Sequence, residues 1–160
     1  ADKPMHDLRD AFGQTIVLST PINGEALVVA VTESENVVQI SVRPGVRLSA
    51  PQSAQGRIAL AYATDSVRQR ILGTLDAGKR AETEGRLADI RTRLYEFSAG
   101  EMLGGINVLA APLLGDGDDL AGALADVIET QDAVAALHAR AAQISAVLGS
   151  AAYDTLSKGR

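Results

Sequence analysis

Side chains that enzymes use as nucleophiles, acids or bases are sparse in this chain. Its two histidines, His6 and His138, fall in the first and last segments with helical periodicity, where a surface or helix-packing role accounts for each of them. A serine nucleophile needs a tight strand-to-helix turn of the form Gly-x-Ser-x-Gly, and the sequence contains no such element. We therefore expect no catalytic residues and a protein that is not an enzyme.

Patterns that hold metal ions or phosphate groups are incomplete. Asp116, Asp118 and Asp119 could begin a calcium loop, but no oxygen-bearing side chain follows at the fifth position and no glutamate closes the loop. Cysteine is absent, which removes thiolates as ligands. The glycines at 104–105 and 115–117 lack the lysine and the serine or threonine of a phosphate loop. We expect no metal site and no cofactor.

One segment has a pattern that is suited to binding an anion. Ser53 is a good N-cap for an alanine-rich helix over 54–63, whose first backbone amides lack acceptors within the helix. The small side chains of Ala54 and Gly56 would let a carboxylate approach the amides of Ala54 and Gln55, beneath apolar strand residues. Two interpretations stay open. The helix start is an anion site, or it is an ordinary helix start at which Gly56 only permits close packing of the helix against the sheet.

The composition favours one soluble domain. With 160 residues, of which 46% are hydrophobic and 22% charged, the chain can bury a core without disulfides or metals. Its 20 acidic residues outnumber 15 basic ones, and the formal charge of -5 has the wrong sign for neutralising nucleic-acid phosphates. No apolar run approaches the roughly 20 residues that span a bilayer, and residues 1–10 are unlike a signal peptide. We expect a cytoplasmic protein with no membrane partner.

Hydrophobic periodicity and turn-forming residues predict one helix, three strands, three helices, three strands and a last helix. The expected helices cover 3–12, 54–63, 65–72, 82–94 and the segment from a cap at Thr130 to Gly149, and the expected strands cover 15–18, 26–32, 37–42, 95–98, 106–113 and 120–128. Residues 76–78 are expected to end the helix before them, 43–51 to form a loop and 115–118 to form a hairpin turn. The run 106–113 is apolar on both faces, which predicts cover on both sides of the sheet. The order lacks alternating βαβ units, so the predicted class is α+β with a largely antiparallel sheet.

Several short motifs occur in a defined order along nearly the whole chain. They are Gly13-Gln-Thr-Ile-Val-Leu-Ser, Arg43-Pro-Gly-Val-Arg-Leu, Ser53-Ala-Gln-Gly-Arg-Ile-Ala-Leu-Ala, Ile90-Arg-Thr-Arg-Leu-Tyr, Gly105-Ile-Asn-Val-Leu-Ala-Ala-Pro, Leu120-Ala-Gly-Ala-Leu and Ala142-Gln-Ile-Ser-Ala-Val-Leu-Gly. With these motifs, the chain from its first helix to Gly149 resembles the C-terminal effector-binding domain of IclR-type bacterial transcriptional regulators. The shared order and spacing carry the resemblance, because each motif alone is short.

The resemblance implies a GAF-like domain over residues 1–150, followed by a flexible tail over 151–160. Such a domain has a curved, mainly antiparallel six-stranded sheet with helices on both faces, and a small-molecule pocket between the sheet and its connecting segments. In the family, the polar end of the effector is held at the start of the helix after the Pro-Gly-x-Arg loop, which here means Ala54 and Gln55. The lining positions on the later strands correspond to Ser98, Val108, Ala125 and Val127.

The sequence departs from the family at several of these positions. The family commonly has Asp at the position of Ser98, Cys at that of Val108 and Ser at those of Ala125 and Val127. We therefore expect a less polar pocket than in relatives, and no zinc, because the carboxylate and the thiol are both replaced. Leu94 also stands at a position that is glycine in the family.

The function implied by the resemblance is regulatory. We expect a domain that senses a small organic acid, with a hydrophobic or aromatic body, and that forms a homodimer or a homotetramer. Contact with DNA is expected only through the family's N-terminal winged helix-turn-helix domain, which we expect to be absent from this chain. The alternative is a purely structural dimerisation or tetramerisation domain with no ligand pocket.

Overall fold

The computed structural model describes residues 2–35, 42–100, 106–128, 133–147, 149–150 and 152–154. The helices are α1 (Asp2–Phe12), α2 (Ala54–Ala61), α3 (Asp65–Leu72), α4 (Ala77–Arg93) and α5 (Ala133–Val147), and the strands are β1 (Ile16–Ile22), β2 (Glu25–Thr32), β3 (Arg47–Leu48), β4 (Glu96–Ala99), β5 (Asn107–Leu114) and β6 (Leu120–Ile128). This is the predicted order of elements. No helix within the described ranges has the length and apolar character needed to cross a membrane.

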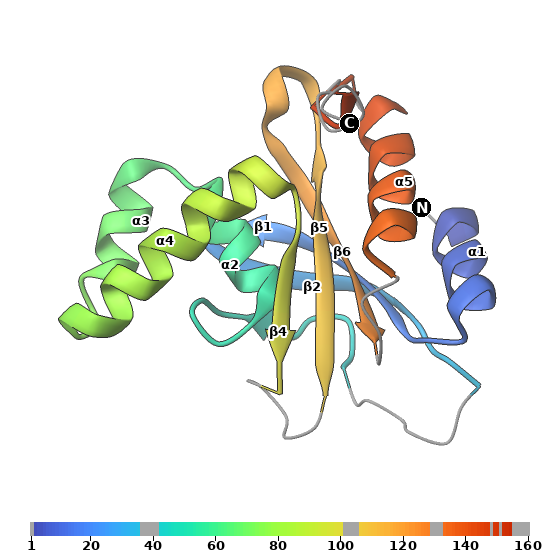
Figure 1. Ribbon diagram of the computed structural model, residues 1–160, viewed down its shortest axis with the longest axis horizontal. Coiled ribbons are helices and arrows are strands. Elements are labelled where there is room, and N and C mark those ends of the chain that lie inside the picture. The colour runs from blue at the N-terminus through green and yellow to red at the C-terminus, as the bar shows by residue number, and fades with distance from the viewer. Residues whose placement is uncertain are drawn as a thin grey trace.

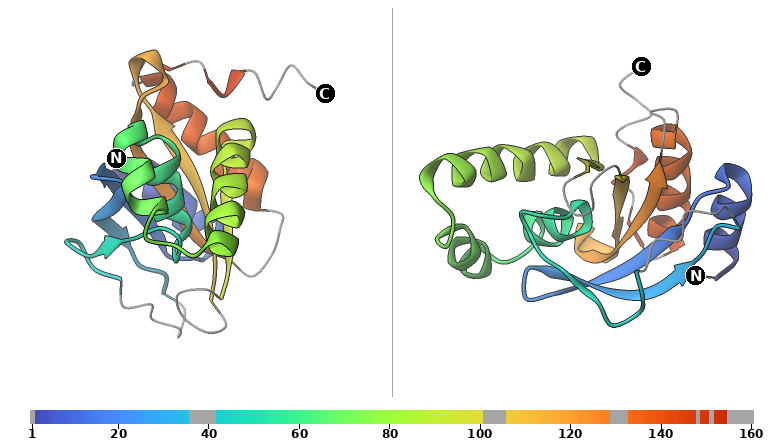
Figure 2. Two further views of the ribbon diagram at one scale, coloured as in Figure 1. Left: turned by 90° about the vertical axis from the view of Figure 1, so that its left-hand side faces the viewer. Right: turned by 90° about the horizontal axis from the view of Figure 1, so that it is seen from below.

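The strands form one antiparallel sheet in the order β3-β2-β1-β6-β5-β4. The turn between β1 and β2 holds Asn23 and Gly24 at positive φ, as a tight hairpin turn requires. Pairing of β1 with β6 joins the first hairpin to the last one. The sheet is strongly curved, with α2 on its concave side (Figure 2). The predicted α+β fold, with the curved six-stranded sheet of GAF-like domains, is confirmed.

Helices cover both faces of this sheet (Figure 1). On one face, α2 and α4 pack on a buried cluster that includes Ile58 and the β5 residue Ala110. On the other face, α1 and α5 contribute Met5 and Leu137 to a second cluster, which Leu109 of β5 joins. Neighbouring residues of β5 are thus buried on opposite sides, which confirms the predicted cover of this apolar strand.

The third strand of the structure differs from the expected one. Most of the predicted strand 37–42 lies outside the described residues, and its last residue, Val42, is not in a strand. The described third strand is β3, inside the segment 43–51 that was expected to be a loop, and it pairs with β2. Leu48 is buried there. The Val28 amide also donates to the Val46 carbonyl oxygen at 2.9 Å, and the Gly45 amide donates to the Val28 carbonyl oxygen at 2.8 Å, so burial and hydrogen bonds together hold the segment beside β2.

Helix α4 begins earlier than the predicted start at residue 82. Its N-cap is Asp76, whose carboxylate accepts a hydrogen bond from the Lys79 amide at 2.9 Å. The expectation that 76–78 end the preceding helix is therefore wrong, because an aspartate before small residues also starts a helix. The helix ends at Leu94, which has left-handed dihedral angles (φ 58, ψ 35) at the position that is glycine in the related family. Leu94 is buried in the second cluster, and this burial offsets the unfavourable backbone conformation.

The C-terminal segments also refine the expectations. The turn predicted at 115–118 is present and contains one turn of 3-10 helix. The last helix lies within its predicted bounds, although 129–132 and 148 fall outside the described residues. Within the predicted tail 151–160, Tyr153 is buried and its hydroxyl donates to the Pro112 carbonyl oxygen at 2.6 Å. The chain is therefore anchored at Tyr153, whereas residues 155–160 lie outside the described part.

Candidate functional site

The first turn of α2 contains two backbone amides without an acceptor. Ser53 is the N-cap in an extended conformation (φ -129, ψ 148), and its hydroxyl oxygen accepts a hydrogen bond from the Gly56 amide at 3.0 Å. The Arg57 amide donates to the Ser53 carbonyl oxygen at 3.0 Å, as the first bond of the helix. Within the described ranges, the amides of Ala54 and Gln55 donate to no oxygen atom. The predicted cap at Ser53 is confirmed.

These two residues are almost completely buried. Ala54 is 2% exposed and Gln55 is 4% exposed. A buried amide without a partner costs about 1–3 kcal/mol, so an acceptor that reaches both amides would be held more strongly than at an exposed helix start. The N-terminal end of the helix dipole would also favour a negative charge there.

Gly56 lies at the closest approach between the turn before α2 and the helix itself. A Cβ at this position would be 2.5 Å from the carbonyl carbon of Ser49 and 2.6 Å from its oxygen. That oxygen is fixed, because it accepts hydrogen bonds from the hydroxyl and the amide of Ser53 at 3.0 and 3.1 Å. The packing interpretation of Gly56 is therefore supported, and it is compatible with an anion site at the two preceding amides.

The Gln55 side chain fixes α2 to the centre of the sheet. Its Nε2 atom donates to the Ser19 hydroxyl oxygen at 2.8 Å and lies 3.4 Å from the Ala123 carbonyl oxygen and 3.5 Å from that of Val17. Ser19 is on β1 and Ala123 is on β6, so one carboxamide spans two strands. Ser19 was not among the predicted site residues; its signal in the sequence is a lone hydroxyl on the inward side of an otherwise apolar strand.

The predicted lining residues on the strands lie on the face of the sheet that α2 covers. They belong to two rows, where a row is a set of residues paired side by side across neighbouring strands. Ser98 of β4 pairs with Val108 of β5, and Val108 pairs with Val127 of β6. Ala125 belongs to the next row, and it shares a buried cluster with Ala54, against which Val108 also packs. The side chain of Val127 lies outside the described part of the structure. The register of the strands thus brings Ser98, Val108 and Ala125 to one face of the sheet, and the packing of α2 on that face adds Ala54 and Gln55.

Glu96, which lies in the same row of the sheet as Ala125, forms a buried ion pair with Arg57. Glu96 of β4 is 2% exposed and Arg57 of α2 is 0% exposed, and the Arg57 Nε atom donates to Glu96 Oε2 at 2.9 Å. Arg86 of α4 donates from Nε to the same oxygen at 3.2 Å, and from NH2 to the Phe97 carbonyl oxygen at 2.8 Å. This ion pair was not predicted from the sequence. Its signal was a glutamate two residues before Ser98, which places both side chains on one face of the strand.

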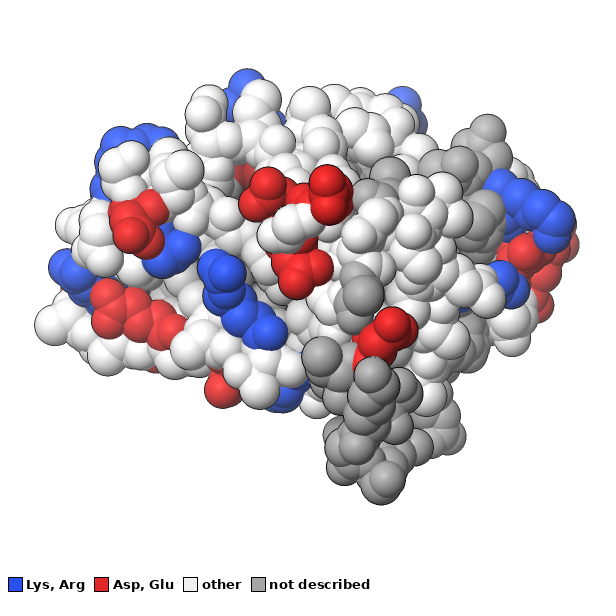
Figure 3. All heavy atoms as spheres, turned by 90° about the horizontal axis from the view of Figure 1, so that it is seen from above, with Lys and Arg blue, Asp and Glu red and all other residues white. Residues whose placement is uncertain are grey.

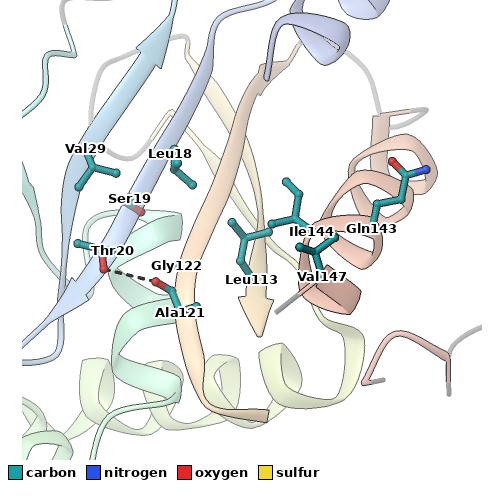
Figure 4. A pocket seen from close by; sticks show the side chains of 10 residues that line it. All are labelled: Leu18, Ser19, Thr20, Val29, Leu113, Ala121, Gly122, Gln143, Ile144 and Val147. Atoms are coloured by element: carbon teal, nitrogen blue, oxygen red, sulfur yellow. Dashed lines mark hydrogen bonds between the residues drawn. The ribbon is translucent and has the colours of Figure 1, made fainter. Parts of the chain in front are cut away.

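Two cavities lie outside the rows just described, and neither is lined by any of the five predicted ligand residues whose side chains the structure describes. The first, of about 520 Å³, lies between the opposite face of β1 and β6 and helix α5; Leu18, Leu113, Ile144 and Val147 point toward it (Figure 4). The second, of about 490 Å³, lies between the turn before α2 and helix α4.

His138 has a packing role. Its Nε2 atom lies 2.9 Å from the Leu94 carbonyl oxygen, and because that oxygen can only accept, Nε2 carries the proton. Its ring also contacts the rings of Tyr95 and Tyr153, at centroid distances of 5.4 and 5.7 Å. Burial lowers the pKa of His138, and the hydrogen bond to Leu94 opposes this effect to a smaller extent. His138 therefore joins α5 to the end of α4, whereas His6 is exposed on α1.

The aspartates of the turn between β5 and β6 form an exposed acidic surface. Asp116, Asp118 and Asp119 are exposed, and acidic side chains gather over this turn (Figure 3). Asp118 accepts a hydrogen bond from the Ser150 hydroxyl at 2.6 Å, so it ties the turn to the C-terminal segment. Among the residues that the structure describes, no three His, Cys, Asp or Glu side chains come together in a way that could hold a metal ion.

Comparisons with known proteins agree with this fold. The family described as "Bacterial transcriptional regulator IclR C-terminal" matches residues 1–147. Among solved structures, the chain is similar to HmgR of Pseudomonas aeruginosa, with 25% identity and a TM-score of 0.82 over 94% of this chain and 66% of HmgR. It is also similar to an IclR-type regulator of Alicyclobacillus acidocaldarius, with 26% identity and a TM-score of 0.77 over 90% of this chain and 64% of that one. No curated protein matches the chain.

The IclR of Thermotoga maritima shares the fold at 19% identity, with a TM-score of 0.80 over 94% of this chain and 67% of that one. The chain thus spans about two thirds of the length of these three solved proteins. The family and its solved members are transcriptional regulators rather than enzymes, as expected from the sequence. The chain therefore belongs to the C-terminal domains of IclR-type bacterial transcriptional regulators.

Proposed function

We propose that residues 1–150 form an effector-sensing domain that binds a small organic acid at the start of α2. The observation that supports this most directly is the pair of buried amides at Ala54 and Gln55, which have no acceptor among the described residues. A carboxylate placed there would accept from both amides and would meet the positive end of the helix dipole.

The expected walls of the site suit a ligand with an apolar body. Ala125 is 1% exposed and belongs to the apolar cluster that contains Ala54, and Val108 packs on the same cluster. Ser98, 3% exposed, supplies a hydroxyl at the edge of these rows, and Val127 continues its row on β6. An organic acid with a hydrophobic or aromatic body matches this combination, because its body displaces water while its carboxylate is hydrogen-bonded. Neither a metal ion nor a cofactor has a part in the proposal.

The proposal predicts a specific effect of proline at the first helical position. Ala54→Pro removes one of the two amides, and the extended conformation of Ser53 already suits a residue that precedes proline. The matched control is Ala77→Pro, at the same position of α4, after Asp76, which is also extended. A thermal-shift screen of organic and aromatic acids, followed by calorimetry on the best binder, should give tenfold or weaker binding for Ala54→Pro and unchanged binding for Ala77→Pro.

Two results would contradict this assignment. A folded Ala54→Pro variant that binds the acid as tightly as the unchanged chain would place the site elsewhere. A screen with no saturable binder would favour the alternative, a structural dimerisation or tetramerisation domain without a ligand. The packing at Gly56 supports that alternative, because it accounts for the glycine without any ligand.

We further propose that the domain assembles as a homodimer or homotetramer in the cytoplasm, and that the effector shifts the placement of separate N-terminal winged helix-turn-helix domains. A ligand shifts such an equilibrium only by its difference in affinity for the two arrangements. The formal charge of -5 is unfavourable for binding DNA phosphates, which supports the proposal that the N-terminal domain makes the contact with DNA. Sedimentation with and without the acid measures assembly, and binding of operator DNA by this chain alone would contradict the division of roles.

A further inference from the structure

The cavity between the turn before α2 and helix α4 is separate from the proposed effector site. It has a volume of about 490 Å³, and Pro51, Gln52 and Arg57 line one side of it. The other side is a single face of α4, formed by Lys79, Glu82, Thr83 and Arg86. The spacing of Lys79, Thr83 and Arg86 by four and three residues is the reason that one helix face presents all three side chains.

Thr83 lines this cavity with a hydroxyl that has no hydrogen-bond partner among the described residues. The residue as a whole is 4% exposed, but its hydroxyl oxygen is not one of the fully buried atoms without a partner, so it reaches the surface of the cavity. A threonine inside a helix ordinarily donates to a carbonyl oxygen three or four residues earlier, as Thr92 does to Ala88 at 3.4 Å. Because Thr83 lines the cavity, a molecule inside the cavity can supply the missing hydrogen bond.

Cationic donors line the same cavity as this hydroxyl. The Lys79 ammonium makes no ion pair with any described residue. Arg57 and Arg86 are held in place by Glu96 and by the Phe97 carbonyl oxygen, so their guanidinium groups form a rigid wall.

Two further side chains set the chemistry at the margin of the cavity. The Oε1 atom of Gln52 accepts from the Ser49 hydroxyl at 3.2 Å, which leaves Nε2 to donate. Among the described residues that line the cavity, Glu82 alone is anionic, and its exposed carboxylate opposes the binding of an anion.

We propose that this cavity is a second ligand site, which binds an oxyanion, the phosphate or carboxylate group of a small molecule. The oxygens accept from the Lys79 ammonium, the Thr83 hydroxyl and the Arg86 guanidinium group. Each of these three groups acts as a hydrogen-bond donor, which matches the acceptor oxygens of an oxyanion. Hydrogen bonds that involve charged groups are stronger than those between neutral groups. The site lies beyond the proposed effector function and does not depend on the amides of Ala54 and Gln55.

The test is an amide chemical-shift titration of the whole chain with sodium phosphate and, separately, with sodium acetate, at constant ionic strength. The expected result is a saturable shift at the amides of Gln52, Lys79 and Thr83 with at least one of the two anions. Saturation by phosphate alone identifies a phosphate-type ligand, and saturation by acetate alone identifies a carboxylate. No saturable shift with either anion would overturn the proposal.

Substitutions make the test specific. Lys79→Met should weaken binding about tenfold, and the nearly isosteric Thr83→Val about threefold to tenfold, the ordinary range for a charged and a neutral hydrogen bond. Glu82→Gln should tighten binding, because it removes the one opposing carboxylate. Lys3→Met makes the same charge change on α1, at a side chain that is 85% exposed, and should leave binding unchanged.

The controls separate this site from general charge effects and from the effector site. Equal weakening by Lys3→Met and Lys79→Met would show that only net charge matters and would overturn the proposal. Ala54→Pro should retain the anion. If Ala54→Pro abolished binding while Lys79→Met kept it, the anion would lie at the start of α2, which would support the proposed function and refute the second site. Thermal unfolding of each variant confirms that the comparison is made between folded chains.

Discussion

Replacing Gly56 with alanine is predicted to destabilise the domain, although the same change ordinarily stabilises a helix by about 1 kcal/mol. The added Cβ would lie 2.5 Å from the carbonyl carbon of Ser49 and 2.6 Å from the Ser53 hydroxyl oxygen. Carbon atoms in good contact are about 3.5–4.0 Å apart, so the turn and the helix must separate by about 1 Å. The contacting atoms of Ser49 belong to the backbone, so they cannot rotate away as the end of a flexible side chain could.

The magnitude follows from the groups that must move. Overpacking of this kind costs about 1–3 kcal/mol. Displacement of the Ser53 hydroxyl also weakens the N-cap by about 1 kcal/mol, which offsets the ordinary gain from alanine. The expected loss for Gly56→Ala is therefore about 1–3 kcal/mol, or a fall in Tm of about 2–12 °C for a domain of this size.

Gly85→Ala in α4 is the matched control. Apart from the adjacent residues and backbone of α4 itself, no described atom lies within 4 Å of the Cβ position at Gly85, so alanine should stabilise the helix by about 1 kcal/mol and raise Tm by about 2–4 °C. Differential scanning calorimetry of the two variants should show shifts of opposite sign. A Gly56→Ala variant at least as stable as the unchanged chain would refute the close approach on which the geometry of the α2 start depends.

Three further substitutions test contacts elsewhere in the domain. Glu96→Gln leaves the buried guanidinium of Arg57 beside a neutral amide and should cost about 3–5 kcal/mol in urea unfolding. His138→Gln should flatten the pH dependence of stability: burial lowers the pKa of His138 below its ordinary 6.5, so its stabilisation is complete above about pH 6.5 and is lost as the pH falls below this value. Tyr153→Phe removes the donor to the Pro112 carbonyl oxygen and should cost about 1–2 kcal/mol, also measured by urea unfolding.

Each of these variants has a control or a contradicting result. Glu84→Gln removes an exposed ion pair and should change stability by less than about 1 kcal/mol, so equal losses for Glu84→Gln and Glu96→Gln would contradict the buried pair. An unchanged pH dependence of stability for His138→Gln would contradict the role assigned to the buried imidazole. An unchanged urea midpoint for Tyr153→Phe would show that this residue does not anchor the C-terminal segment.

Elements with strong periodicity could be predicted from the sequence alone. The apolar strand β5, the hairpin with Asn23 and Gly24, and the helices with regular apolar spacing all lie close to their predicted ranges. The short strand β3 could not be predicted, because its two residues are placed by pairing with β2 and by the burial of Leu48, and neither contact leaves a local pattern in the sequence. The start of α4 was missed because Asp76 fits a helix end and a helix start equally well in sequence.

The candidate site was predictable in part. Ser53 and the residues after it carry a local capping signal, and the capped helix start was found from that signal. The Gln55 side chain reaches strands that are distant in sequence, and the Arg57 and Glu96 pair is separated by 39 residues. No local sequence pattern predicts such contacts, because they depend on how α2 packs on the sheet. For the same reason, the cavity beside Thr83 became visible only in the fold.

The decisive measurement is a crystal structure of the chain with the tightest-binding organic acid from the screen. We expect the carboxylate oxygens to lie within hydrogen-bond distance, about 2.7–3.2 Å, of the amide nitrogens of Ala54 and Gln55, with the body of the acid over Ala125 and Val108. An acid that occupied the cavity beside α5 instead, and left both amides without an acceptor, would contradict this expectation.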